Sequence, residues 1–227
     1  SSGTLGFLAD NETIYFQSEK TGYSHLYTYN LRTNKKVQLT NGNWEVRGVV
    51  LSKDKKAFYL TTNQTHPGNR GFYKMNVSDA VLQPILTKDG AHEVSLSPDE
   101  KTLLVRYSYK NKPWELYWAT NKKGSSLNQI TFSTTAAFQE YNWRSPEVIT
   151  FKAQDGTSVN ARLYTPNASQ ANKAAVIFVH GAGYLQNAHN HWSTYHREYM
   201  FHNLLTDLGY TVLDIDYRGS DGYGRSE

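Results

Sequence analysis

The chain has 227 residues, of which 38% are hydrophobic and 14% aromatic, a composition that supports a packed core and argues against disorder. Its net charge is +4, from 24 Lys and Arg against 20 Asp and Glu. The absence of cysteine excludes disulfides and thiolate chemistry but does not fix the compartment. No stretch approaches the roughly 20 apolar residues of a membrane span, and the sequence does not open on a signal peptide.

Short basic runs are spread along the chain at residues 35–36, 55–56 and 122–123. Each lies in a polar stretch between apolar runs, where solvated turn tips are expected. We therefore expect these lysines to be exposed rather than to form a nucleic-acid-binding patch, and no nucleic-acid partner is expected.

The first 140 or so residues are predicted to form short strands and turns. Apolar or alternating runs are separated by turn residues such as Gly22 and Asn34, and no amphipathic helix of normal length is evident. The predicted strands include residues 14–16, 26–29, 46–51 and 57–60.

A repeat of about 45 residues runs through this region. Leu26-Tyr27, Phe72-Tyr73 and Leu116-Tyr117 begin successive units, at spacings of 46 and 44 residues. Two units share a second marker, because Leu51-Ser52-Lys53-Asp54 matches Leu96-Ser97-Pro98-Asp99 at a spacing of 45 residues. Ser and Asp side chains in such a turn can bond its backbone.

A period of this length with four short strands is typical of a β-propeller blade. One four-stranded sheet cannot bury both of its faces, so blades must stack around an axis. The alternative is a set of hairpins in a β-sandwich. Because propellers close with about 4–8 blades, we expect the missing blades upstream of Ser1, and we expect Tyr27, Tyr73 and Tyr117 in equivalent places.

The pattern changes after residues 143–146. Residues 148–152 and 158–164 read as two strands joined by Asp155-Gly156, a strong hairpin signal. Residues 174–179 follow as a continuous apolar run of the kind found in buried strands.

A helix and a further strand come next. Residues 195–208 are predicted to be helical, because Phe201, Leu204, Leu205 and Leu208 recur at helical spacing and Gly209 is a natural stop. Residues 211–215 form the next strand. Strand, helix and strand together predict a βαβ crossover with the two strands parallel.

The stretch that carries chemistry directly follows the apolar run. Acyl-transfer enzymes aim backbone N–H groups at a developing oxyanion, and a glycine-rich turn at this place supplies one such donor in α/β-hydrolases. The alternative is a plain strand-to-loop turn. The candidate oxyanion-hole residues are His180, Gly181 and Ala182, and the candidate residues of a substrate cleft are Gly183 and Tyr184.

The order of these motifs resembles the prolyl oligopeptidase family of serine peptidases, with the dipeptidyl-peptidase IV and acylaminoacyl-peptidase branches nearest. The resemblance covers nearly the whole chain and is most specific at residues 149–166, 216–220 and 222–224. The family often has a tyrosine just before the glycines of the first motif. Here that position holds His180, which leaves open whether its side chain donates to the oxyanion or only shapes the turn.

The resemblance implies a multidomain protein with an all-β part and an α/β part. Residues 1–143 are expected to be the last blades of a β-propeller, and residues 144–227 the first part of an α/β-hydrolase domain, ending before the nucleophile. The implied function is hydrolysis of peptide bonds in short peptides by acyl transfer through a serine. An esterase with the same core and a non-catalytic propeller that binds a partner remain as alternatives, and exopeptidase or proline specificity stays open.

Neither of two serines near the C-terminal end fits the nucleophile elbow. The family's triad serine lies in a Gly-x-Ser-x-Gly turn directly after a buried strand. Ser220 has Arg218 in place of the first glycine, and Ser226 follows a Gly-Tyr-Gly loop. None of the catalytic triad is therefore expected in this sequence, and the chain alone should be inactive.

The remaining polar clusters are given structural interpretations. His189, His191, His196 and His202 lack the spacing of a zinc site and are expected to be loop histidines near the cleft. Asp214 and Asp216, on one face of a strand, are expected to bond the following loop rather than act as an acid/base pair. No metal or cofactor is expected. The resemblance favours a peptide substrate, a homodimer, and a periplasmic or secreted location over a cytoplasmic one.

Overall fold

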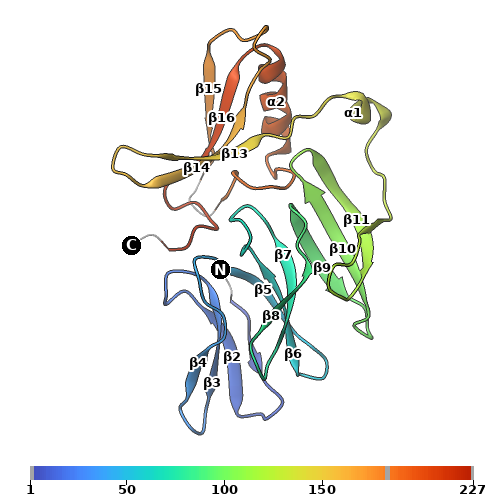
Figure 1. Cartoon of the computed structure of the whole chain (residues 1–227), viewed down its shortest axis with the longest axis vertical. Coiled ribbons are helices and arrows are strands. Elements are labelled where there is room, and N and C mark those ends of the chain that lie inside the picture. The colour runs from blue at the N-terminus through green and yellow to red at the C-terminus, as the bar shows by residue number, and fades with distance from the viewer. Residues whose placement is uncertain (1–2, 182–184, 226–227) are drawn as a thin grey trace. The chain divides into compact units, whose positions relative to one another are not determined.

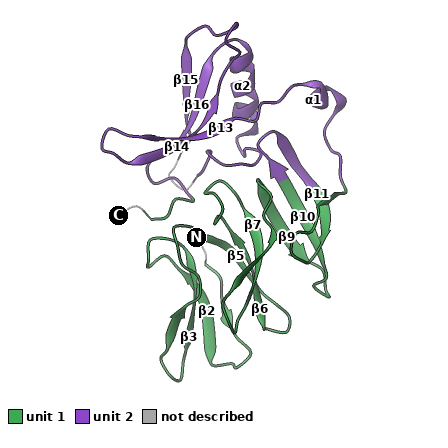
Figure 2. Cartoon of the chain, in the orientation of Figure 1, with its two compact units in different colours: residues 1–107, 116–130, 222–227 green, residues 108–115, 131–221 purple. Residues whose placement is uncertain are grey.

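The computed structural model describes residues 3–181 and 185–225, and Figure 1 shows the elements along the chain. The candidate residues Ala182, Gly183 and Tyr184, and also Ser226, lie outside the described residues. The chain divides into two compact units (Figure 2). Unit 1 comprises residues 1–107, 116–130 and 222–227, and unit 2 comprises residues 108–115 and 131–221.

The first twelve strands form three successive four-stranded sheets, in each of which strands follow one another in sequence order. Such a meander is the fold of a propeller blade. The first sheet contains β1 (Leu5–Phe7), β2 (Thr13–Ser18), β3 (His25–Asn30) and β4 (Lys36–Gln38). The second contains β5 (Val46–Leu51), β6 (Ala57–Thr62), β7 (Gly71–Asn76) and β8 (Leu82–Leu86). The third contains β9 (Ala91–Leu96), β10 (Thr102–Tyr109), β11 (Lys112–Thr120) and β12 (Asn128–Gln129).

The three tyrosines that begin the sequence repeat occupy the same place in the three sheets. Tyr27 lies on β3, Tyr73 on β7 and Tyr117 on β11, which is the third strand of each sheet. The prediction of equivalent positions is therefore confirmed, and with it the division of this region into blades.

The shared Ser-x-Asp turn has the same hydrogen bonds in the second and third sheets. Ser52 Oγ donates to Asp54 at 2.7 Å and accepts from the Ala57 amide at 2.9 Å. Ser97 Oγ donates to Asp99 at 2.7 Å and accepts from the Thr102 amide at 3.0 Å. The side chains thus close each turn, as the sequence predicted.

The core of unit 1 is built from side chains of the first two sheets. Tyr15 meets Phe58 edge to face, with ring centroids 5.1 Å apart, an arrangement that adds to the burial of both rings. The buried cluster consists of Leu8, Tyr15, Leu26, Val46, Phe58, Leu60 and Met75.

Unit 2 contains the fourth sheet, in the order β13-β14-β16-β15. Its strands are β13 (Glu147–Lys152), β14 (Ser158–Tyr164), β15 (Ala175–Val179) and β16 (Thr211–Asp216). The unit also contains the helices α1 (Ala136–Glu140) and α2 (His196–Asp207). β13 and β14 form the predicted hairpin, with Gly156 at its turn in the left-handed region.

The βαβ prediction is confirmed, because β15 and β16 are parallel with Val176 opposite Val212, and α2 lies between them in sequence. Assignment of this sheet to an α/β-hydrolase domain stays a prediction. α2 ends where predicted: Leu208 is the C-cap, Gly209 has a φ of 88°, and its amide donates to the Thr206 carbonyl at 3.1 Å.

One burial expectation in this region is wrong. β15 is the edge strand, and Ile177 and Val179 are 63% and 59% exposed, so the apolar run is not a buried central strand. The apolar residues that located α2 include its exposed face, with Phe201 and Leu204 open to solvent. The helix instead buries Tyr199, His202, Asn203 and Thr206. Spacing of 3–4 residues locates a helix but does not decide which face packs.

No single position in the sequence divides unit 1 from unit 2, because residues 222–225, which follow unit 2 in the chain, belong to unit 1. There Asn63 donates to the Gly222 carbonyl at 2.9 Å, and the Gly224 amide donates to Glu45 at 3.2 Å. The boundary between residues 143 and 144 stays a prediction. Within the described residues, no helix is long and apolar enough to cross a membrane.

Candidate active site

The glycine turn begins at the carboxyl end of β15. Gly181 is exposed, two residues beyond Val179, and its backbone lies outside the left-handed region. Among the described residues, which exclude 182–184, no atom lies within 4 Å of a Cβ placed on Gly181. No described residue therefore requires glycine at this position. Ligands of open α/β sheets bind at this end of the strands.

His180 is buried beneath the turn, with 3% of its surface exposed. Its Nδ1 lies 2.7 Å from the Gly181 carbonyl oxygen. Its Nε2 lies 3.2 Å from both an Asp216 carboxylate oxygen and Ser220 Oγ. Tyr217 stacks on the imidazole at 4.7 Å, and its hydroxyl donates to the Gly181 carbonyl at 2.8 Å. Both ring nitrogens therefore face atoms that fix the turn.

Ser220, His180 and Asp216 do not have the arrangement of a catalytic triad. In a triad the serine and the carboxylate lie at opposite ring nitrogens, whereas here both lie at Nε2. Ser220 is 4% exposed and its hydroxyl donates to the Tyr217 carbonyl at 2.7 Å. These contacts make Ser220 part of the support for the turn.

Asp216 and Asp214 organise the loop that leads from β15 to α2. Asp216 accepts hydrogen bonds from the Asn187 amide at 2.6 Å and the Ala188 amide at 3.0 Å. Asp214 accepts from the Asn187 side chain at 2.9 Å. The sequence interpretation was correct that both carboxylates bond a loop. It predicted the loop that follows β16, whereas these hydrogen bonds come from Asn187 and Ala188, in the loop that precedes α2 and β16.

The burial of Asp214 raises its pKa to about 6, an effect that the Asn187 hydrogen bond and the charge of Arg162 partly oppose. His202 Nδ1 lies 3.9 Å from Asp214. Burial lowers the pKa of His202 to about 4, helped by the charge of Arg162. His202 is therefore neutral near pH 7, and its contact with Asp214 is not a charged pair.

Arg162 is a fully buried cation on β14 that the sequence analysis did not single out. Its Nε donates to the His189 carbonyl at 2.9 Å, and its Nη2 donates to the His191 carbonyl at 2.5 Å. The rings of these two histidines stack at 3.5 Å. A charged residue between apolar neighbours in a predicted strand is the signal that could have identified it, since an arginine is rarely buried without partners.

The four histidines considered as a metal cluster lie in different elements and have different contacts. His189 and His191 lie in the loop held by Arg162, His196 begins α2, and His202 packs on Phe178 at 5.1 Å. Among the residues that the structure describes, no group of three or more His, Cys, Asp or Glu is placed to hold a metal ion.

Comparison with known proteins identifies a family that matches part of the chain. Residues 2–114 match the family of the dipeptidyl peptidase IV N-terminal region. That match covers the first two sheets and the third as far as the start of β11, and it supports the assignment of these sheets to a propeller.

Similar proteins extend the likeness beyond the blades. An uncharacterized peptidase, YuxL, of Bacillus subtilis is 29% identical over 78% of this chain and 25% of its own length. A dipeptidyl peptidase 4 of Trichophyton rubrum is 25% identical over 99% of this chain and 30% of its own length, and one of Arthroderma otae is 24% identical over the same shares. The chain thus spans about a quarter to a third of the length of these relatives. Together with the family match, they show that the chain is similar to dipeptidyl peptidase IV, and they support the resemblance to the prolyl oligopeptidase family of peptidases.

Proposed function

We propose that the protein is a serine peptidase that hydrolyses peptide bonds of short peptides by acyl transfer. The observation that carries the proposal is the exposed Gly181 at the carboxyl end of β15, in a chain whose relatives are named as peptidases. Those names favour a peptide over an ester substrate and favour catalysis over a purely binding propeller.

The turn after β15 supplies the oxyanion-binding groups in this proposal. Backbone amides at Gly181 and Ala182 donate to the oxygen that becomes negative when the substrate carbonyl is attacked. Gly183 and Tyr184, which lie outside the described residues, are the proposed residues of the substrate cleft. Gly181 is exposed, and no atom of the described residues lies within 4 Å of its Cβ direction, which supports access of a substrate to the turn.

His180 is proposed to act as a positioning residue. Its nitrogens lie against Gly181, Asp216 and Ser220, so its ring holds the turn from below. Preorganised donors stabilise a transition state because they do not have to reorient during the reaction. A direct donation from the His180 side chain is the alternative, and it requires the ring to leave these partners.

The nucleophile is proposed to lie outside the 227 residues. The sequence contains no complete Gly-x-Ser-x-Gly motif, and Ser220 is held in the support of the turn. The 227-residue chain alone should therefore show no peptidase activity, since removal of a triad nucleophile costs several orders of magnitude in rate.

Hydrolysis assays with the full-length protein test the proposal. A panel of dipeptidyl amides, internally quenched longer peptides and p-nitrophenyl esters separates exopeptidase, endopeptidase and esterase activity. We expect hydrolysis of peptide substrates and covalent labelling by a fluorophosphonate probe, which reacts with activated serines. Hydrolysis of esters without peptides would support the esterase alternative. Failure of labelling and of all hydrolysis would favour a binding propeller.

Two further properties complete the proposal. The full-length protein is proposed to form a homodimer, which light scattering after size exclusion tests by mass. It is proposed to be periplasmic or secreted, which fractionation of the source cells tests. A monomeric mass or a cytoplasmic location contradicts the respective statement.

A further inference from the structure

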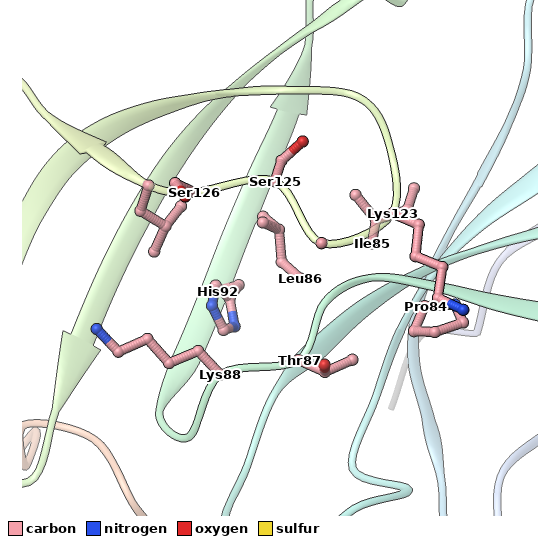
Figure 3. A pocket seen from close by; sticks show the side chains of 11 residues that line it. Pro84, Ile85, Leu86, Thr87, Lys88, His92, Lys123, Ser125 and Ser126 are labelled. Atoms are coloured by element: carbon pink, nitrogen blue, oxygen red, sulfur yellow. The ribbon is translucent and has the colours of Figure 1, made fainter.

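A pocket of about 450 Å³ lies in unit 1, between the end of β8 and the loop that joins β11 to β12 (Figure 3). It is remote in sequence from the glycine turn. Its volume is within the range of small-molecule sites. Ile85 and Leu86, both buried, form part of its wall, and Leu127 adds a third apolar side chain.

His92 lines this pocket and carries an unused hydrogen-bond acceptor. The side chain is 1% exposed, and its Nδ1 lies 2.8 Å from the Arg70 carbonyl oxygen, to which only an Nδ1–H can donate. Burial lowers the pKa of His92 to about 4, so the ring is neutral near pH 7. Nε2 then carries a lone pair, and it is buried without a hydrogen-bond partner. An orphaned buried acceptor is costly and rare.

Cationic and hydroxyl groups also line the pocket. Lys88 and Lys123 are exposed lining residues, and the Lys88 ammonium lies 5.3 Å from the Tyr107 ring centroid. Ser125 Oγ is a second buried polar atom without a partner. Figure 3 shows Lys88 on one side of the His92 ring and Leu86 on the other. The pocket therefore offers positive charge at its edge, an acceptor inside and an apolar wall.

We propose that this pocket binds the C-terminal residue of a peptide with an apolar side chain. In such a residue a carboxylate, an N–H donor and an apolar group share one carbon atom. The carboxylate pairs with Lys123, the amide N–H donates to His92 Nε2, and the side chain packs against Ile85 and Leu86. The proposal does not depend on the peptidase activity.

Binding of small probes to the full-length protein tests each part of the recognition. N-acetyl-L-leucine carries all three features, N-acetyl-L-leucinamide lacks the charge, and 4-methylpentanoate lacks the N–H. We expect saturable millimolar binding of N-acetyl-L-leucine, weakened about tenfold or more in either of the other probes. In NMR spectra of ¹⁵N-histidine-labelled protein, the Nε2 resonance of His92 should move on titration with N-acetyl-L-leucine.

Substitutions at the edge of the pocket give a second test. Lys123→Gln should weaken N-acetyl-L-leucine about two- to fivefold, since its ammonium is exposed and screened. Lys122→Gln, with the same charge change one residue away and outside the lining, should leave the affinity unchanged. The proposal is overturned if N-acetyl-L-leucine shows no saturable binding at 10 mM (about ten times the expected constant). It is also overturned if the amide probe binds equally well, or if the two lysine variants behave alike.

Discussion

The blade turns of unit 1 and the support of the glycine turn in unit 2 satisfy their polar groups over very different distances in the sequence. In unit 1 the turn bonds join near neighbours, such as Ser52 and Asp54. In unit 2 the buried Asp216 accepts from Asn187, 29 residues earlier, and Arg162 donates to His189, 27 residues later. The local bonds recur with the repeat, whereas the support of the glycine turn depends on partners that only the complete fold brings together.

The largest expected effect comes from removing the centre of the network in unit 2. Asp216→Ala leaves the buried amides of Asn187 and Ala188 without their acceptor and should lower the free energy of unfolding by about 3–5 kcal/mol. Urea denaturation of the full-length protein measures this. Asp155→Ala, an exposed carboxylate in the same unit, is the control, and equal effects of the two variants would refute the comparison.

Gly209→Ala should be the next most damaging change. Gly209 has a φ of 88°, and a Cβ there would lie 2.2 Å from the Gln170 carbonyl oxygen. We expect a loss of about 2–4 kcal/mol in the free energy of unfolding. Gly124→Ala in unit 1 shares the left-handed backbone but meets no atom within 4 Å, so it should cost only about 1–2 kcal/mol. Thermal denaturation that ranks Gly124→Ala as the worse variant contradicts the account.

Asp214→Asn should stabilise the fold in a pH-dependent way. Because burial raises the pKa of Asp214 to about 6, its neutral form is favoured in the fold. That contribution is fully present below about pH 4 and is lost as the pH rises through 6. The variant should match the wild type near pH 4 and exceed it by about 1–3 kcal/mol in the free energy of unfolding at pH 7.5.

His202 gives the free energy of unfolding an opposite pH dependence, in the variant and the wild type alike. Subtracting the wild-type value from the variant value at each pH removes this contribution. The pKa of His202 is lowered to about 4, so its contribution to stability is lost as the pH falls from about 6.5 towards 4. Asp155→Asn should show the reverse sign to Asp214→Asn, since hydrogen bonds from Thr157 and the charge of Arg218 lower the pKa of Asp155. A difference for Asp214→Asn that does not change between pH 4 and 7.5 would contradict the pKa direction.

The smallest expected effects concern the two equivalent blade turns. Ser52→Ala removes a buried hydroxyl that donates to Asp54 and accepts from the Ala57 amide, and it should cost about 1 kcal/mol in the free energy of unfolding. Ser97→Ala removes the same pair of bonds in a more exposed turn and should cost less. Chemical denaturation of both variants measures the ranking, and a larger loss for Ser97→Ala would break it.

Much of the fold was predictable because its signals are local. The repeat placed Tyr27, Tyr73 and Tyr117 on matching strands, Asp155-Gly156 placed a hairpin, and Gly209 placed the end of α2. Turn chemistry and hydrophobic period act over a few residues, so a single sequence reveals them.

The burial of the elements and the partners of the site were not predictable in the same way. The apolar run at β15 gave no indication that it would be an edge strand, because sheet order is a property of the whole unit. Arg162 and Asn187 were missed for the same reason, since their roles follow from contacts with residues 27 positions away. His180 was found, but the partners of its ring were not.

The central claim is that the turn after β15 serves acyl transfer and is not required by the fold. Steady-state kinetics of Gly181→Val in the full-length protein test it most directly. Gly48→Val is the control, because a Cβ at Gly48 also makes only ordinary contacts, at 3.7 Å. We predict that both variants fold and that only Gly181→Val lowers kcat, by about 10²–10³-fold. A folded Gly181→Val protein with the wild-type kcat would show that this turn takes no part in catalysis.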